Sequence, residues 1–215
     1  MHRFASAVLL PLVVWAAPLA AQGEARLEVS LPPSGFLATQ GPTVRTLGML
    51  TDRQTRDLLR NGFPARLHYR VELWSSDGLF DDLKGQVEWD VVVRHDPLLR
   101  TYQVARIVGE AVTSLGSFAD VQGAQEALSR PFQAPFAPGA RGERLYYNVV
   151  LEVEMLSLND LDEVERWLKG ELRPAVRGER NPGTALTRGV RTLFVRLMGG
   201  EKRTYRERSG RFRTR

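Results

Sequence analysis

The sequence predicts an α+β fold, a mostly antiparallel β-sheet or open sandwich with two C-terminal helices. Central segments alternate apolar and polar residues with period two, as strands with one covered face do. Their connections are too short for the helical crossovers that parallel strands require, so neighbouring strands must pair antiparallel. Two later segments repeat apolar residues at helical spacing. With 43% hydrophobic residues in a chain of 215, one domain can bury a sizeable core.

The first 21 residues have the features of a secretory signal peptide. A short basic start precedes an apolar run over residues 4–19, and Ala20-Ala21 supplies small residues at its end. The run is shorter than the roughly 20 residues that cross a membrane. Cleavage after Ala21 is therefore expected, with an uncleaved anchor as the alternative, and the mature protein is predicted to be periplasmic or secreted. The chain has no cysteine, which excludes disulfides, a lipoprotein attachment site and thiolate metal sites.

The N-terminal part of the domain combines one strand, a loop and one helix. Residues 26–31 alternate as a short first strand, and the prolines and glycine of 32–35 end it. From there to Met49 no period is visible, which predicts a loop. A short helix is expected next, because Thr51 and Gln54 have capping-box spacing and Asn61-Gly62 supplies a stop.

The middle of the chain predicts the main sheet. Residues 65–74 and 85–95 alternate cleanly, and residues 99–107 continue the pattern with a possible fourth strand at 110–115. Turn chemistry at Ser75–Gly78 separates the first two, although the ten-residue connection is too long for a tight hairpin.

One helix and the longest strand complete this region. Residues 119–128 follow Ser117, with Asp120 as its capping partner, and predict a helix. Residues 130–142 are rich in Pro, Ala and Gly and predict a mobile loop. Residues 144–156 then alternate over the longest apolar face in the chain.

The two C-terminal helices are predicted from capping residues at their ends and from apolar residues at helical spacing between them. Asn159 caps the first, which ends before Gly170, and Asn181-Pro182 opens the second, which ends at Gly199. We expect a signal peptide at 1–21, a single domain at 22–200 and a basic, disordered tail at 201–215.

The net charge of +5 resides in that tail, which holds seven basic residues and two acids. The folded body is therefore close to neutral, which argues against nucleic acid as a partner. The tail is predicted to be solvated, with attraction to an anionic membrane surface as the alternative. Trp74 is either an anchor for a partner or covered by a terminal helix. The candidate interaction residues are Trp74, Arg188, Arg191, Lys202, Arg203 and Arg206.

Four short pieces in residues 55–155 carry a family resemblance. They are Leu58–Tyr69, Asp96–Tyr102, Phe118–Leu128 and Gly142–Tyr147. In this order they resemble an uncharacterised family of exported bacterial proteins, catalogued among the domains of unknown function. The resemblance implies no active site. In some relatives the gene sits beside a membrane sensor histidine kinase, which implies an envelope role near signalling.

No motif for catalysis, a cofactor or a metal stands out. His68 and His95 lack ligand partners at zinc spacing and are predicted to be surface residues. Asp81-Asp82 has no repeated calcium spacing, and no Gly-x-Ser-x-Gly elbow or phosphate loop occurs.

The predicted function is therefore non-enzymatic, with no cofactor and no metal: an exported envelope protein that acts as an interaction or accessory module for an unknown protein partner. Two alternatives remain. One is a binding protein for a small apolar or lipid ligand, and the other is a hydrolase built from dispersed carboxylates.

Overall fold

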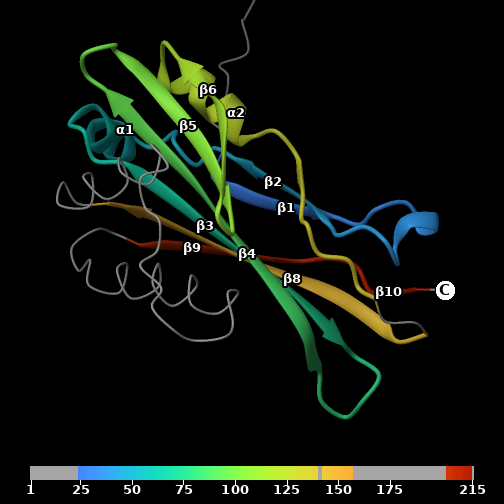
Figure 1. The fold of residues 1–215 in the computed structure, drawn as a ribbon. Helices are drawn as coiled ribbons and strands as arrows, with labels where there is room; N and C mark the ends of the chain where they lie inside the picture. The colour runs from blue at the N-terminus through green and yellow to red at the C-terminus, as the bar shows by residue number, and fades with distance from the viewer. Residues whose placement is uncertain (1–23, 140–141, 157–201, 215) are drawn as a thin grey trace, which may run out of the picture.

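The computed structural model describes residues 24–139, 142–156 and 202–214, and it contains two antiparallel sheets and two short helices (Figure 1). The large sheet has the order β10-β8-β3-β4-β5-β6, with β9 also paired to β8, and the small sheet has the order β1-β2-β7. Every strand pairing that the structure describes is antiparallel, which confirms the coarse prediction. The strands are β1 (Arg26–Ser30), β2 (Thr43–Leu47), β3 (Ala65–Ser75), β4 (Asp82–Asp96), β5 (Thr101–Val108), β6 (Ala111–Phe118), β7 (Phe132–Gln133), β8 (Arg144–Met155), β9 (Arg203–Arg208) and β10 (Phe212–Arg213).

Strand β3 is the centre of the large sheet. It pairs along its whole length with β4 on one side and with β8 on the other. Leu67, Val71 and their alternate neighbours are buried, as their period predicts. Strand β4 begins at Asp82, three residues earlier than expected, because its pairing with β3 continues past a register shift at Leu73/Trp74. The hairpin connection is therefore residues 76–81.

The small sheet contains two strands, β2 and β7, that periodicity did not reveal. β2 lies in the predicted loop before Met49, and β7 lies in the predicted mobile loop at 130–142. β7 has only two residues, which cannot display a period. In β2 the buried positions hold Val44 and the polar Thr46, so apolar and polar residues do not alternate. Gly41 is required at the start of β2, because a Cβ there would lie 2.3 Å from the carbonyl oxygen of Ala134.

The core lies between the small sheet and one face of the large sheet. Tyr69 of β3 stacks on Trp89 of β4 with ring centroids 4.9 Å apart, and Trp89 meets the edge of Phe132 of β7 at 5.2 Å. The Tyr69 hydroxyl also shares a buried hydrogen bond of 3.2 Å with Thr46 of β2. Trp89 is 3% exposed and belongs to the core.

The two described helices are internal rather than C-terminal. They are α1 (Arg53–Arg60) and α2 (Val121–Leu128), and their N-caps are Asp52 and Asp120. Both were expected from sequence, but the capping residues are the aspartates, which accept a backbone N–H at 2.8 Å, and not Thr51 or Ser117. The C-terminal helices predicted around 159–170 and 181–199 lie outside the described residues.

The basic C-terminal segment is part of the sheet, which corrects the expectation of a disordered tail. Strands β9 and β10 both pair with β8, whose outer edge would otherwise be unpaired. Phe212 is buried and stacks on Tyr147 at 5.5 Å. Ser209 accepts a hydrogen bond from the Tyr147 backbone N–H at 2.9 Å. The segment contains too few apolar residues for its sequence to predict strands. It forms strands because the backbone groups along the outer edge of β8 need hydrogen-bond partners.

Candidate functional site

The face of the large sheet opposite the core carries an ion-pair network centred on Arg66. The Arg66 guanidinium donates to both carboxylate oxygens of Asp90, at 2.8 and 3.2 Å, and to Glu154 at 2.8 Å. The register brings them together, because Arg66 of β3 lies opposite Glu154 of β8, and Asp90 of β4 lies opposite His68, two residues farther along β3 on the same face. The side chains of Arg66 and Asp90 are only 9% and 11% exposed. The network therefore links three strands through nearly buried charges.

His68 belongs to this network, which corrects its prediction as a surface histidine. Its Nδ1 lies 2.9 Å from an Asp90 carboxylate oxygen, and its Nε2 lies 4.0 Å from Glu88. Burial opposes the charge on Asp90, but hydrogen bonding to His68 and the charge of Arg66 outweigh it and hold the pKa of Asp90 below its usual value.

An aspartate that orients a histidine is a known arrangement for general-base chemistry. Here Arg66 contacts both oxygens of Asp90, and within the described part of the chain no hydroxyl is hydrogen-bonded to His68. We therefore interpret the group as a structural network that joins β3, β4 and β8.

The Trp74 side chain is hydrogen-bonded within the face of the large sheet on which it lies. Its indole N–H donates to Glu72 at 3.0 Å, and Asn148 donates to the same carboxylate oxygen at 2.9 Å. Burial would raise the pKa of Glu72, but the hydrogen bonds from Asn148 and Trp74, with the charge of Arg70, lower it. Trp74 is half-buried, so its polar edge is already occupied and is not free to contact a partner.

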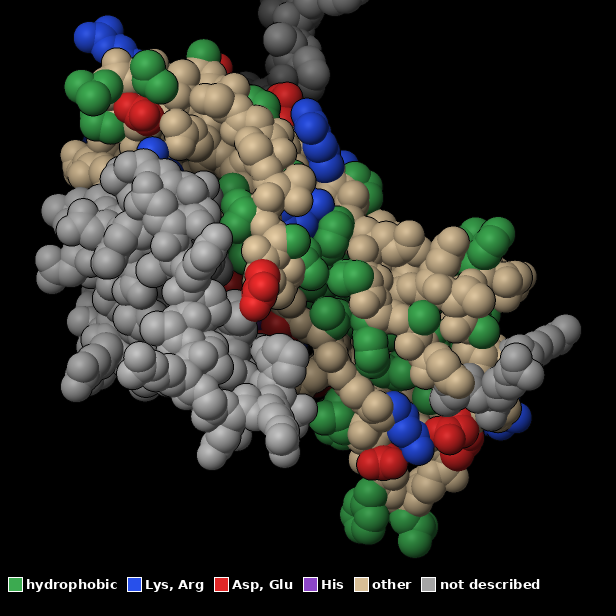
Figure 2. Space-filling model, in the orientation of Figure 1, with side chains coloured by type: hydrophobic (Ala, Val, Ile, Leu, Met, Phe, Trp, Pro, Cys, Tyr) green, Lys and Arg blue, Asp and Glu red, His purple; other side chains and the backbone are tan. Residues whose placement is uncertain are grey.

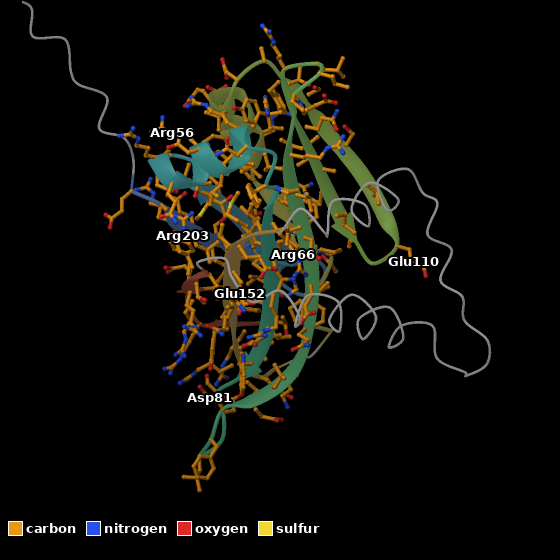
Figure 3. All side chains as sticks on the ribbon, turned by 90° about the vertical axis from the view of Figure 1, so that its left-hand side faces the viewer. Arg56, Arg66, Asp81, Glu110, Glu152 and Arg203 are labelled. Carbon is orange, nitrogen blue, oxygen red and sulfur yellow. The ribbon has the colours of Figure 1, made fainter. Side chains whose placement is uncertain are left out.

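Three of the other candidate residues lie in the described part of the chain, at or beside β9, and two of them are paired within the fold. Arg203 donates to Asp52 at 2.9 Å and to Thr55 at 2.7 Å, which ties β9 to the start of α1. Lys202 pairs with Glu152 at 2.7 Å. Arg206 is exposed. Arg188 and Arg191 lie outside the described residues. Figure 3 shows Arg203 beside α1, with Glu152 and Arg66 farther along the sheet. Much of the basic charge of the tail is thus used within the fold.

Two adjacent large apolar side chains at the tip of the β3–β4 hairpin are almost fully exposed. Leu79 is 99% exposed and Phe80 is 87% exposed. The hairpin projects beyond the rest of the large sheet (Figure 1), and apolar side chains occupy its end (Figure 2). We call residues 76–81 the hairpin tip. Sequence reasoning described this segment only as turn chemistry, although two adjacent large apolar residues among polar turn residues were a signal.

Two aspartates fix the hairpin tip to β8. Asp77 accepts the backbone N–H of Arg144 at 2.5 Å, and Asp81 accepts the Tyr146 hydroxyl at 2.6 Å. These contacts bracket Leu79 and Phe80, so the apolar pair is presented from a loop held at both ends. Figure 3 shows Asp81 at this end of the sheet.

The acids that suggested a calcium site have other partners. Asp81 binds Tyr146, and Asp82 pairs with Lys84 at 3.2 Å. Among residues 24–139, 142–156 and 202–214, no group of three or more His, Cys, Asp or Glu side chains could hold a metal ion.

A pocket between the two sheets bears on the small-ligand alternative. It is lined by residues from both sheets, including Tyr69, Trp89 and Arg106, and its volume is about 10 Å³. This is close to the space that one water molecule needs, whereas small-molecule sites measure hundreds of Å³.

No protein family, curated protein or solved structure matches the chain. The family resemblance of residues 55–155 therefore stays a prediction. Neither of the helices in the described ranges has the length and apolar character needed to cross a bilayer.

Proposed function

We propose that the chain is a non-enzymatic, exported envelope protein that acts as an interaction or accessory module, with the hairpin tip as its docking element. The observation that carries the proposal is the near-complete exposure of Leu79 and Phe80 on a loop that is fixed at both ends. Neighbouring pairs of large apolar residues at a projecting tip are typical of interaction sites.

The energetics of the tip favour binding. Full burial of a leucine or phenylalanine side chain contributes roughly 1.5–3 kcal/mol each. A flexible loop would lose part of this gain on ordering. The contacts of Asp77 with Arg144 and of Asp81 with Tyr146 reduce that loss, because they hold the loop before the partner arrives.

Charge indicates which partner the tip fits. Residues 76–83 contain three aspartates and no basic residue, and two of these aspartates pair with cations outside the segment, Asp82 with Lys84 at 3.2 Å and Asp77 with Arg213 at 3.7 Å. The negative charge that remains on Asp81 disfavours an anionic lipid surface and favours cationic side chains. The proposed partner is therefore a protein with an apolar pocket bordered by Lys or Arg. A membrane sensor kinase, the context that the family resemblance implies, is a candidate for this partner.

Site-specific photocrosslinking in the envelope tests the proposal. A photoreactive phenylalanine analogue at position 80 should give one discrete protein adduct, and Asp81→Asn should reduce its yield. Leu98, which is 94% exposed in the β4–β5 turn, is the matched control position. Absence of a discrete adduct at position 80, or the same adduct at position 98, would contradict the proposal.

Export is tested separately by the mass of the protein recovered from the envelope fraction. Cleavage after Ala21 predicts a chain that begins at Gln22. An unprocessed chain found only in the cytosol would contradict the envelope role without bearing on the hairpin tip.

A further inference from the structure

Arg106 interrupts the apolar pattern on the core-facing side of β5. Tyr102 and Val104 precede it on that side and are 6% and 1% exposed. Arg106 lies opposite Val91, as Val104 lies opposite Val93, so the register places it on the same face. A cation at a core-facing position of a strand needs a physical explanation.

The guanidinium of Arg106 has an aromatic neighbour, and no described residue forms an ion pair with it. Its central carbon lies 3.7 Å from the centroid of the Phe132 ring. Within the described part of the chain, its Nε is buried without a hydrogen-bond partner. Burial lowers the pKa of Arg106 from its ordinary value, although the group remains a cation at neutral pH. A buried donor in this state calls for an ion or water beside it.

The pocket beside Arg106 is also lined by a second cation. Arg106 and Arg130 both line it, together with Thr46, Tyr69, Trp89 and Phe132, and none of the described residues in its wall carries a carboxylate. Arg130 is exposed, so the pocket reaches the surface on that side. Tyr69 does not supply the missing charge, because burial raises the pKa of its hydroxyl to about 12.

We propose that the pocket between Arg106 and Arg130 is an anion site that takes one carboxylate group. The volume of about 10 Å³ accepts one carboxylate oxygen, while the rest of the group lies on the open side near Arg130. The Arg106 Nε–H, which has no partner among the described residues, would donate to that oxygen. A charge-assisted bond from guanidinium to carboxylate is short, about 2.7–2.9 Å, and a chloride ion is too large to approach as closely.

The test is titration of the purified full chain with sodium acetate at constant ionic strength, with sodium chloride as the reference. Acetate should raise Tm saturably and change the emission of Trp89, which lines the pocket. Arg106→Gln should weaken acetate binding by at least about tenfold, since it removes a charged hydrogen-bond donor. Arg206→Gln makes the same charge change at an exposed position of β9 and should leave the response unchanged.

Arg106→Lys keeps the charge but loses the planar fork, and it serves if Arg106→Gln does not fold. It should bind acetate more weakly than the native chain does. No saturable response, an equal response to chloride, or an unchanged response in both Arg106 variants would overturn the proposal. Triglycine shows whether the site takes a small free acid or the C-terminus of a peptide, because only a site for a C-terminus should bind triglycine more tightly than acetate. The C-terminal amide of triglycine, which has no carboxylate, is the control and should not bind. The hairpin tip is not involved, so the outcome is independent of the proposed docking role.

Discussion

Two consecutive residues of β3 show how differently the two faces of the large sheet are stabilised. Leu67 belongs to the apolar core and is fully buried. Arg66, on the opposite face, is almost as inaccessible but is held by Asp90 and Glu154. Loss of an apolar side chain leaves a cavity, whereas loss of one charge leaves its partners buried and uncompensated. Both residues are therefore buried, but the core face is stabilised by apolar packing and the opposite face by ion pairs.

The largest effect is expected from breaking the network at its centre. Arg66→Met should lower the free energy of unfolding by about 3–5 kcal/mol, because Asp90 and Glu154 then lack their shared cation. Denaturant unfolding followed by circular dichroism measures this. Arg70→Met is the matched control on the same strand and face; its side chain is 37% exposed, and its loss should cost less than about 1 kcal/mol. Equal losses would show that the network does not depend on burial.

The core face is probed by Leu151→Ala in β8. Leu151 is fully buried opposite Tyr69, so its truncation should cost about 2–4 kcal/mol. Leu98→Ala, at an exposed turn, should change the free energy of unfolding by no more than about 0.5 kcal/mol. A small loss for Leu151→Ala would mean that β8 can collapse into the space.

The dependence of stability on pH should distinguish the ion-pair network from the apolar core. The folded pKa of Asp90 lies below its unfolded value of about 3.8, so its stabilisation is complete above that value and is lost as pH falls through the folded pKa. Below about pH 4 the native protein and Leu151→Ala should therefore lose stability in parallel. Arg66→Met should lose less, because the folded pKa of Asp90 rises without the arginine. Parallel curves for all three proteins would refute this role of Arg66.

The smallest effect on stability is expected at the hairpin tip. Phe80→Ser removes a side chain that is 87% exposed, so the free energy of unfolding should change by less than about 0.5 kcal/mol. The same variant should lose any partner that binds through the tip. A large drop in Tm would instead show that Phe80 contributes to the fold.

Local sequence patterns determined the long elements. Clean alternation predicted β3, β4, β5 and β8, because each is long enough to display a period of two. Capping chemistry placed α1 and α2 within about two residues, since a helix start depends on nearby side chains. Strand β7 was missed because it has only two residues, and β2 was missed because a polar residue, Thr46, occupies one of its two buried positions.

Tertiary structure alone decided the charged sites and the fate of the basic segment. The sequence predicted His68 as a surface residue and made no prediction for Arg66. Only strand register brings Asp90 and Glu154 to these two residues from distant parts of the chain. The strands β9 and β10 form because the edge of β8 is available for hydrogen bonding, which no local signal encodes. Periodicity is a property of neighbours in the chain, whereas pairing of charges and strand edges depends on neighbours in space.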